Sequence, residues 1–411
     1  MKNYFSQRVS GAKRSAIREL LKLTEQPDII SFGGGLPAPE SFPHRELAEI
    51  AHRELMNNYA NVLQYGTTEG SRTLRDAFVE WLRSQGIDAT RDQLLVTAAS
   101  QQGLDLLCKA FFDPGDVMFC GLPTYLGAIQ AFSLFQIDKI GVLLEDDGMN
   151  IDDLEKKIAE AKKSGKRMKG IYVIPDFQNP SGITLSLEKR RQMLEIAKRE
   201  DLLIFEDNPY GHLRFAGESI PSIYSMDTEG RVIMLLTFSK ILSAGLRLAV
   251  MITRRPDFMD ALVRTKQATD LCTSKLTQHL AARYMLDYGL DQHLDEIRPL
   301  YHEKRDAMID ALEKYMPKDE DIRWTHPDGG LFIWVWLPDG IDTQEMLARA
   351  IEIKVAYVPG ASAFVDGTGH NTMRLAFSSS TPEQIDEGIR RLAGVVKEEI
   401  ASKMVGAHES A

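Results

Sequence analysis

The sequence predicts an α/β protein: a large domain with a mainly parallel sheet flanked by helices, followed by a smaller α+β domain. Between residues 94 and 253, short β-rich runs alternate with helical patterns. These runs lack the strict polar–apolar alternation of a half-exposed sheet, as is typical of strands buried on both faces. After about residue 257 the pattern changes to long amphipathic helices and then to a few short strands and a closing helix, which indicates an α+β domain.

The large domain is expected to follow strand–helix order. The predicted strands cover residues 94–97, 117–120, 170–174, 202–206, 232–236 and 248–253. The helical patterns between them cover residues 103–111, 125–135, 151–163 and 187–199. Because ligands of such sheets bind at the carboxyl ends of the strands, we expect the loops that follow the strands to carry the chemistry.

The C-terminal part is expected to contain a long helix through 301–315, strands at 331–337 and 373–377, a strand ending at 359–360, and a helix from Pro382. The first ~45 residues fit no strong element. We therefore divide the chain into an N-terminal arm and loop that joins the small domain (1–45), the large domain (46–290) and the small C-terminal domain (291–411).

Composition excludes several classes of protein. The 411 residues suffice for two or three domains, and 49 Lys plus Arg against 59 Asp plus Glu give a net charge of -10. That charge argues against nucleic acid or an anionic membrane as the main partner. The three cysteines form no CxxC pair, so neither a zinc motif nor a disulfide framework is indicated. Without a signal-peptide pattern or an apolar run of ~18 residues, we expect a cytoplasmic protein with no metal and no membrane partner.

The common catalytic signatures are absent: there is no P-loop, no GxGxxG after a strand, no HExxH and no GxSxG. Polar residues instead follow the predicted strands. Ser100 and Gln101 follow the first strand, where small residues at a strand-to-helix turn leave N–H groups that can bind an anion. An ordinary helix-capping serine is the alternative. Asn179, after a later strand, is either a turn former or a donor that faces the crevice.

Lys240 is the strongest candidate for chemistry. It lies just beyond a buried strand, after Thr237 and Ser239, and Asp207 and Tyr210 follow a neighbouring strand. Most lysines are solvated surface groups. Burial and nearby cations, however, lower the pKa of a lysine from about 10.4 toward the range in which the free amine is available. Such a lysine can form a Schiff base.

This ordered series of residues resembles the pyridoxal-phosphate-dependent aminotransferases of fold type I, over essentially the whole chain. The resemblance is greatest to the branch with 2-aminoadipate, kynurenine and aromatic aminotransferases. The strings that carry it are SAIREL (15–20), GGGLPAPESFP (33–43), LQY (63–65), TEG (68–70), SQQ (100–102), PTY (123–125), QNPSG (178–182), Asp207 with PY (209–210), TFSK (237–240), GLR (245–247) and MRL (373–375).

The resemblance implies a homodimeric enzyme that moves an amino group between an L-amino acid (2-aminoadipate, aromatic or similar) and 2-oxoglutarate by a ping-pong mechanism. Lys240 would carry pyridoxal 5′-phosphate and shuttle a proton, and Asp207 would pair with the pyridine nitrogen. Asn179 and Tyr210 would hydrogen-bond the ring 3-oxygen. The other implied cofactor contacts are Tyr125 stacked on the ring, Ser100, Gln101, Thr237, Ser239 and Arg247 at the phosphate, and Tyr65 from a second subunit.

Substrate contacts are also implied by the resemblance. Arg374 would bind the α-carboxylate in two parallel bonds, which a lysine could not match. For Arg374 and Arg247 alike, an ion pair at the surface is the alternative. Arg18 matches a position in the N-terminal arm where a cation meets a distal carboxylate, or it merely decorates a helix. Gly35, with its neighbours Gly34 and Leu36, would line that pocket.

The sequence departs from the usual pattern of this family at two places, and two alternative functions are considered. Ala99 stands where the family usually has glycine, and we expect its Cβ to narrow the phosphate turn or to force φ below zero. Ala244 and Ala249 stand where proline and glycine are commoner. A lyase or decarboxylase could use the same cofactor. A ligand-sensing module of transcription regulators is disfavoured, because the match begins near Ser15 and the chain lacks a basic surface.

Overall fold

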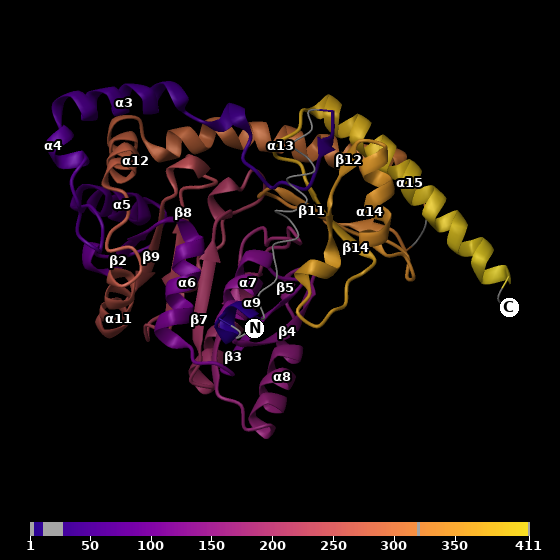
Figure 1. Cartoon of the computed structure of the whole chain (residues 1–411), viewed down its shortest axis with the longest axis horizontal. Coiled ribbons are helices and arrows are strands. Elements are labelled where there is room, and N and C mark those ends of the chain that lie inside the picture. Colours follow the sequence, from indigo (N-terminus) through magenta and orange to yellow (C-terminus); the bar gives the residue numbers. More distant parts are fainter. Residues whose placement is uncertain (1–3, 11–27, 319–320, 410–411) are drawn as a thin grey trace.

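The computed structural model describes residues 4–10, 28–318 and 321–409, with side chains to residue 403. An eight-stranded sheet forms the centre of its larger part, and a four-stranded sheet lies in the C-terminal part (Figure 1). The predicted fold class, α/β with a second α+β region, is confirmed. Within the described residues, no helix is both long enough and apolar enough to cross a membrane.

The large sheet is mainly parallel. Its strands in spatial order are β2 (Leu94–Thr97), β9 (Ala249–Thr253), β8 (Val232–Thr237), β7 (Leu203–Asn208), β6 (Met168–Val173), β3 (Val117–Leu122), β4 (Asp138–Glu145) and β5 (Gly148–Met149). The strands from β8 to β4 run parallel, whereas β9 is antiparallel to both of its neighbours and β5 is antiparallel to β4. Thr97 and Thr237 both lie opposite Ala249. The carboxyl ends of β2 and β8 therefore meet the start of β9 at one edge.

Helices cover both faces of this sheet, which explains why β2, β8 and β9 are buried along their whole length. One face carries α6 (Ala99–Phe111), α7 (Leu126–Leu134) and α11 (Pro256–Gln267). The other carries α8 (Ile151–Lys163), α9 (Leu187–Arg199) and α10 (Ile223–Met226). Side chains cap α8 and α9 where the sequence supplies them: Asn150 accepts from the Asp153 N–H at 2.7 Å, and Ser186 from the Lys189 N–H at 3.4 Å.

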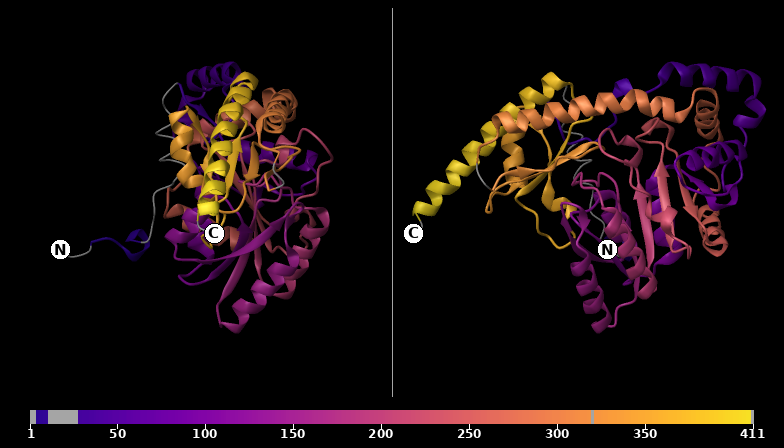
Figure 2. Two further views of the ribbon diagram at one scale, coloured as in Figure 1. Left: turned by 90° about the vertical axis from the view of Figure 1, so that its right-hand side faces the viewer. Right: turned by 180° about the vertical axis from the view of Figure 1, so that it is seen from behind.

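A long helix, α13 (Leu290–Tyr315), joins the two parts of the molecule (Figures 1 and 2). It runs from the region of α5 (Arg72–Ser84) and α12 (Lys275–Asp287) to the second sheet, whose order is β10 (Arg323–Trp324), β11 (Phe332–Trp336), β14 (Thr372–Ala376) and β13 (Val358–Pro359), all antiparallel. The helices α14 (Thr343–Glu352) and α15 (Pro382–Glu409) complete this part.

The described N-terminal segment crosses to the second sheet before the large domain begins. Its short strand β1 (Ile30–Ser31) pairs in parallel with β12 (Val355–Ala356). The Ala376 N–H then donates to the Phe32 carbonyl at 2.8 Å. This anchoring places the glycine-rich residues 33–35 between the two sheets, directly beside β14. Helices α3 (His44–Asn57) and α4 (Tyr59–Val62) follow, against α12.

Candidate active site

The predicted strand-end residues gather where the carboxyl edge of the large sheet faces β14. Arg374 on β14 is buried, and it connects three distant segments of the chain. Its Nη1 donates to Asn179 Oδ1 at 2.9 Å, and its Nη2 donates to the Gly33 carbonyl at 2.6 Å. Asn179 therefore turns its side chain toward the crevice. Burial lowers the pKa of Arg374 to about 10, which leaves the guanidinium charged at neutral pH.

Lys240 lies in the turn after β8, and its Nζ donates to the Gly35 carbonyl at 2.9 Å. Burial, together with the positive charges of Arg374 and Arg247, lowers its pKa to about 8. A useful fraction of the amine is thus uncharged near neutral pH. Gly35 has φ +56°, and a Cβ there would lie 2.7 Å from the Phe332 ring, so only glycine fits this close approach.

Asp207 is the last residue but one of β7, and its side chain is almost wholly buried. Its Oδ2 accepts from the Tyr172 hydroxyl at 2.8 Å. Its Oδ1 has no hydrogen-bond partner among the described residues. Burial raises the pKa of Asp207 to about 6, against the opposite effect of the Tyr172 hydrogen bond. A buried carboxylate with one free oxygen suits a partner that brings its own N–H.

Aromatic rings surround these charged groups. Tyr210 is buried, and its hydroxyl hydrogen-bonds the Asn179 side chain. Its ring meets Phe332 edge-on, with centroids 5.6 Å apart, and the Arg374 guanidinium lies 4.4 Å from the centre of the same Phe332 ring. Burial raises the pKa of Tyr210, so the phenol stays protonated and can donate. Tyr125, just before α7, is half-buried and close enough to Tyr210 to raise that pKa further.

A second group of donors lies where β2, β8 and β9 meet. The Ser100 hydroxyl, in the first turn of α6, is buried without a partner among the described residues. Thr237 Oγ1 donates to Ser239 Oγ at 2.9 Å and accepts from the Ser239 N–H at 3.1 Å. Arg247 is exposed, with its Nη1 3.3 Å from the Ala244 carbonyl. Hydroxyls, a guanidinium and a helix start are together suited to an anion.

One of the two outcomes expected of Ala99, a φ below zero, is wrong. Its φ is 65°, so the methyl group neither forces φ below zero nor prevents the turn. Side chains fix this turn: Thr97 Oγ1 donates to the Ala99 carbonyl at 3.1 Å, and Gln102 Oε1 accepts from the Ala98 N–H at 2.7 Å. These bonds offset the ~1–2 kcal/mol that a left-handed conformation costs an L-residue.

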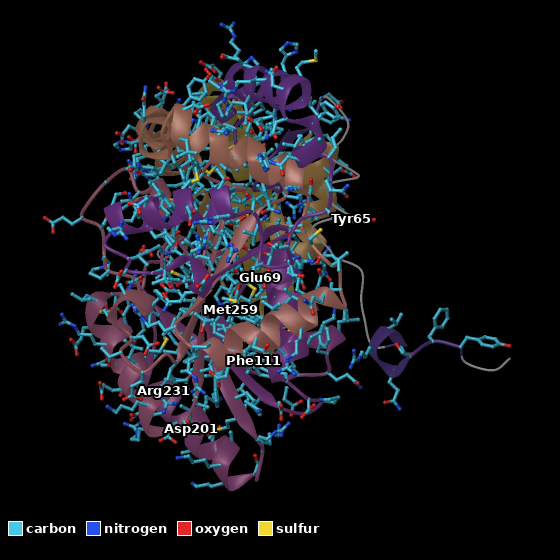
Figure 3. The ribbon with its side chains drawn as sticks, turned by 90° about the vertical axis from the view of Figure 1, so that its left-hand side faces the viewer. Tyr65, Glu69, Phe111, Asp201, Arg231 and Met259 are labelled. Carbon is cyan, nitrogen blue, oxygen red and sulfur yellow. The ribbon has the colours of Figure 1, made fainter. Side chains whose placement is uncertain are left out.

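Three of the candidate residues do not join the others in this chain. Gln101 is exposed, and its Nε2 donates to the Gly127 carbonyl at 3.0 Å, so its side chain lies along α7. Tyr65 is 76% exposed beyond α4, and Figure 3 shows it at the outer margin of the molecule. Arg18 lies outside the described residues.

Sequence reasoning missed Tyr172 and Phe332. Tyr172 lies opposite Phe205 on the neighbouring strand, and therefore on the same face as Asp207, two residues further along. Aligned by their ends, the two predicted strands would instead set Tyr172 opposite Ile204, on the other face, so the sequence offered no signal for this pair. Phe332 comes from the other sheet and carries no catalytic group, so no local signal in the sequence pointed to it.

These residues fit pyridoxal phosphate. The site offers an amine of lowered pKa, a buried carboxylate with a free oxygen for the ring nitrogen, and hydroxyl and guanidinium donors for a phosphate. Among the described residues, no group of three or more His, Cys, Asp or Glu side chains is placed to hold a metal ion.

Comparison with known proteins points to one family. The model of the family described as aminotransferase class I and II matches residues 27–392. An aromatic-amino-acid aminotransferase of Thermococcus litoralis is 46% identical over 97% of this chain and 95% of its own length. A 2-aminoadipate transaminase of Thermus thermophilus is 40% identical over 93% and 94%. The crystal structure of a Pyrococcus horikoshii kynurenine aminotransferase superposes with a TM-score of 0.92 at 44% identity, over 96% of this chain and 97% of that one.

The family match, the identities and the agreement in fold all extend over nearly the whole chain. The chain therefore belongs to the class I and II aminotransferase family, and it is a pyridoxal-phosphate-dependent aminotransferase of fold type I.

Proposed function

We propose that this enzyme transfers the amino group of an L-amino acid with an acidic or aromatic side chain to 2-oxoglutarate by a ping-pong mechanism. The observation that carries the proposal is the pair Lys240 and Arg374, an amine of lowered pKa and a buried guanidinium that donate to the neighbouring carbonyls of Gly35 and Gly33. Similarity to aromatic, 2-aminoadipate and kynurenine aminotransferases supports this substrate range.

Bound pyridoxal phosphate supplies an electron sink for the electrons released at the substrate Cα. Lys240 is the residue to which we assign cofactor attachment and, as a free amine, proton transfer at that carbon. Asp207 holds the ring nitrogen through its free Oδ1, and Asn179 and Tyr210 donate to the ring 3-oxygen. Tyr125 supplies a flat surface for the ring.

The phosphate is assigned to the donors at the junction of β2, β8 and β9, namely Ser100, Thr237, Ser239 and Arg247. Gln101 joins them through its place in the same turn, with its side chain turned toward α7. The free hydroxyl of Ser100 and the exposed guanidinium of Arg247 support this assignment. Several donors share one dianion, so each contributes modestly to its binding.

Arg374 is assigned to the substrate α-carboxylate. Its charge, its burial and the unpartnered Nε within the described residues suit a two-point bond to a carboxylate. For the distal side-chain carboxylate we propose Arg18, which lies outside the described residues. Gly35, with Gly34 and Leu36, would line the space that an aromatic side chain fills instead.

We propose that the enzyme is a homodimer in which Tyr65 completes the neighbouring site. Five large apolar side chains are exposed around the end of α3 and around α4: Leu55, Met56, Tyr59, Leu63 and Tyr65. This apolar patch is what a partner subunit would cover.

We also propose that the chain divides into an N-terminal arm and loop (1–45), a large domain (46–290) and a small C-terminal domain (291–411), and that the protein is cytoplasmic.

The decisive experiment replaces Lys240 with alanine. Lys240→Ala should lower kcat by about a thousandfold or more, because among the described residues of the site Lys240 is the amine placed to attach the cofactor and to move the Cα proton. Lys139→Ala, which removes another lysine of lowered pKa on β4, is the matched control and should remain active. Turnover by Lys240→Ala at the wild-type rate would refute the assignment.

A panel of donors then tests the substrate range. Aminoadipate, aromatic amino acids, leucine and methionine should be offered with and without 2-oxoglutarate. Transfer requires the acceptor, so product from the donor alone indicates a lyase or decarboxylase. Failure of every acidic and aromatic donor with cofactor bound contradicts the proposal.

A further inference from the structure

Tyr172 is the one side chain in the described part of the chain that hydrogen-bonds Asp207. Its hydroxyl donates to Oδ2 at 2.8 Å, and the residue is 1% exposed. Because Oδ2 is engaged in this way, the opposite oxygen of the carboxylate, Oδ1, is left for another partner. We propose, on the basis of the function proposed above, that Tyr172 is a positioning residue that keeps Asp207 ionised and aims its Oδ1 at the cofactor ring nitrogen.

The fold places this tyrosine rigidly. Tyr172 stands on β6 opposite Phe205 of β7, and both strands run parallel in the middle of the sheet. On the other side its ring packs edge-on against Phe132 of α7, with centroids 5.3 Å apart. A side chain held by a central strand and a covering helix cannot follow a rotating carboxylate, so the bond fixes the χ angles of Asp207 rather than adapting to them.

The electrostatic surroundings explain why one hydrogen bond matters here. Among the described residues, the titratable groups that act on Asp207 or on its phenol neighbours are Tyr172 on β6, Tyr210 beyond β7, Tyr125 ahead of α7 and the cation Arg374 on β14. Burial raises the pKa of Asp207 to about 6, and the Tyr172 hydroxyl is the protein group that works against this rise. Burial also raises the pKa of Tyr172 well above its ordinary value, so this phenol remains a donor.

The consequence concerns the position of one proton. A ring nitrogen keeps its proton only if its carboxylate partner is the weaker base. Without the Tyr172 hydrogen bond, the carboxylate becomes more basic, and the proton shifts from the ring nitrogen toward Asp207. The ring then withdraws electrons less strongly. Tyr172 thereby acts on catalysis through Asp207 without touching the reacting atoms.

The test uses Tyr172→Phe, which removes only the hydroxyl. In enzyme reconstituted with cofactor labelled with ¹⁵N at the ring, the ¹⁵N signal should move toward that of an unprotonated pyridine. The dissociation constant of the cofactor at pH 7 should rise about tenfold, the effect of one hydrogen bond to a charged group. The pH below which cofactor affinity falls should rise by about one unit.

Tyr357→Phe is the matched control. It also deletes a buried tyrosine hydroxyl with one hydrogen bond, to the Thr343 carbonyl at 2.7 Å, but in the other part of the molecule. It should leave the ¹⁵N signal and the pH profile unchanged. Should Tyr172→Phe fold poorly, 3-fluorotyrosine at position 172 keeps the packing while making the phenol a stronger donor, and its shifts should have the opposite sign.

Asp207→Asn separates the two hypotheses. If Asp207→Asn leaves the ¹⁵N signal of the ring unchanged, the proposed role of Asp207 itself fails. If Asp207→Asn changes the signal and Tyr172→Phe does not, Asp207 keeps its role and the inference about Tyr172 is overturned.

Discussion

At the scale of single residues, the site depends on charges that burial makes unusual. Lys240 is kept partly uncharged because water is excluded and because Arg374 and Arg247 are cations. Burial also raises the pKa of Asp207, and the hydrogen bond from the Tyr172 hydroxyl opposes this rise. The amine of lowered pKa is suited to take up and release a proton near neutral pH, whereas the tyrosine hydrogen bond favours the ionised form of Asp207.

The first prediction concerns the titration of Lys240. Reaction of the apoprotein with pyridoxal, which lacks the phosphate and so does not depend on the phosphate donors, should accelerate with pH through a midpoint near 8, because only the uncharged amine attacks the aldehyde. Arg247→Gln should move this midpoint upward, since removing a nearby cation makes the protonated amine less unfavourable. Stopped-flow absorbance measures both rates.

The control is Arg231→Gln, which makes the same change of charge elsewhere. Arg231 immediately precedes β8, whereas Lys240 follows the end of that strand, and Figure 3 shows Arg231 beside Asp201 in the lower part of the molecule. This variant should keep the wild-type midpoint. A midpoint near 10.4 in the wild-type protein, as for a solvated lysine, would contradict the argument.

At the scale of elements, α6 is linked through Gln102 to a partly buried ion pair at the end of α11. Lys266 on α11 is wholly buried, and its Nζ donates to Asp270 Oδ1 at 2.6 Å. Asp270 Oδ2 accepts from Gln102 Nε2 at 2.7 Å, and Gln102 in turn accepts from the first N–H of the phosphate turn. The position of the phosphate turn thus depends, through Gln102, on the charged pair Lys266 and Asp270.

The second prediction follows from this arrangement. Asp270→Asn should lower the free energy of unfolding by about 3–5 kcal/mol, because it leaves the buried Lys266 charge without a counter-ion. Asp105→Asn breaks a half-exposed pair with Lys109 on α6 itself and should cost less than about 1 kcal/mol. Urea denaturation of the apoproteins measures both. Equal losses in the two variants would refute the role assigned to burial.

The elements show how far the sequence could predict the structure. Strand 94–97 and helices 151–163 and 187–199 were predicted to the residue, because apolar runs and capping residues define them locally. The strand β4 was missed, since most of its residues are only half-buried and its pattern is mixed. Lys240, Asp207 and Asn179 could be proposed as site residues because each follows a predicted strand. Tyr172 and Phe332 could not, because their roles depend on pairing between strands and between sheets.

At the scale of the whole molecule, several large apolar side chains are exposed close together on the surface. The apolar patch around α3 and α4 exposes Tyr59 by 62%, Leu63 by 64% and Tyr65 by 76%. These helices pack on α12 at the end of the molecule furthest from the second sheet (Figure 1). Exposed side chains of this size, close together, are costly in water and are typical of an interface.

The third prediction is that the protein is a dimer, with a mass in sedimentation twice the chain mass of 46.2 kDa. Leu63→Glu should give monomers, because it would bury an unpaired carboxylate in the interface. The monomers should also release cofactor more readily, since Tyr65 no longer reaches a second site. Leu143→Glu, at an apolar side chain 56% exposed on β4, should remain dimeric. Sedimentation velocity decides, and a Leu63→Glu protein that stays dimeric would contradict the interface.

The reversed strand β9 has a further consequence for how the enzyme can be altered. The turn from β8 to β9 holds Lys240 and Arg247, and both of its ends are fixed: Thr237 faces Ala249, and the Phe238 N–H donates to the Leu248 carbonyl at 3.0 Å. An insertion or deletion in this turn would slide the buried strand and turn its side chains to the wrong face. The residues around Gly35 belong to no such hairpin. We therefore expect a change of chain length to disrupt the site at the turn that carries Lys240, and the bonds from Lys240 and Arg374 to the Gly35 and Gly33 carbonyls restrict the facing segment as well.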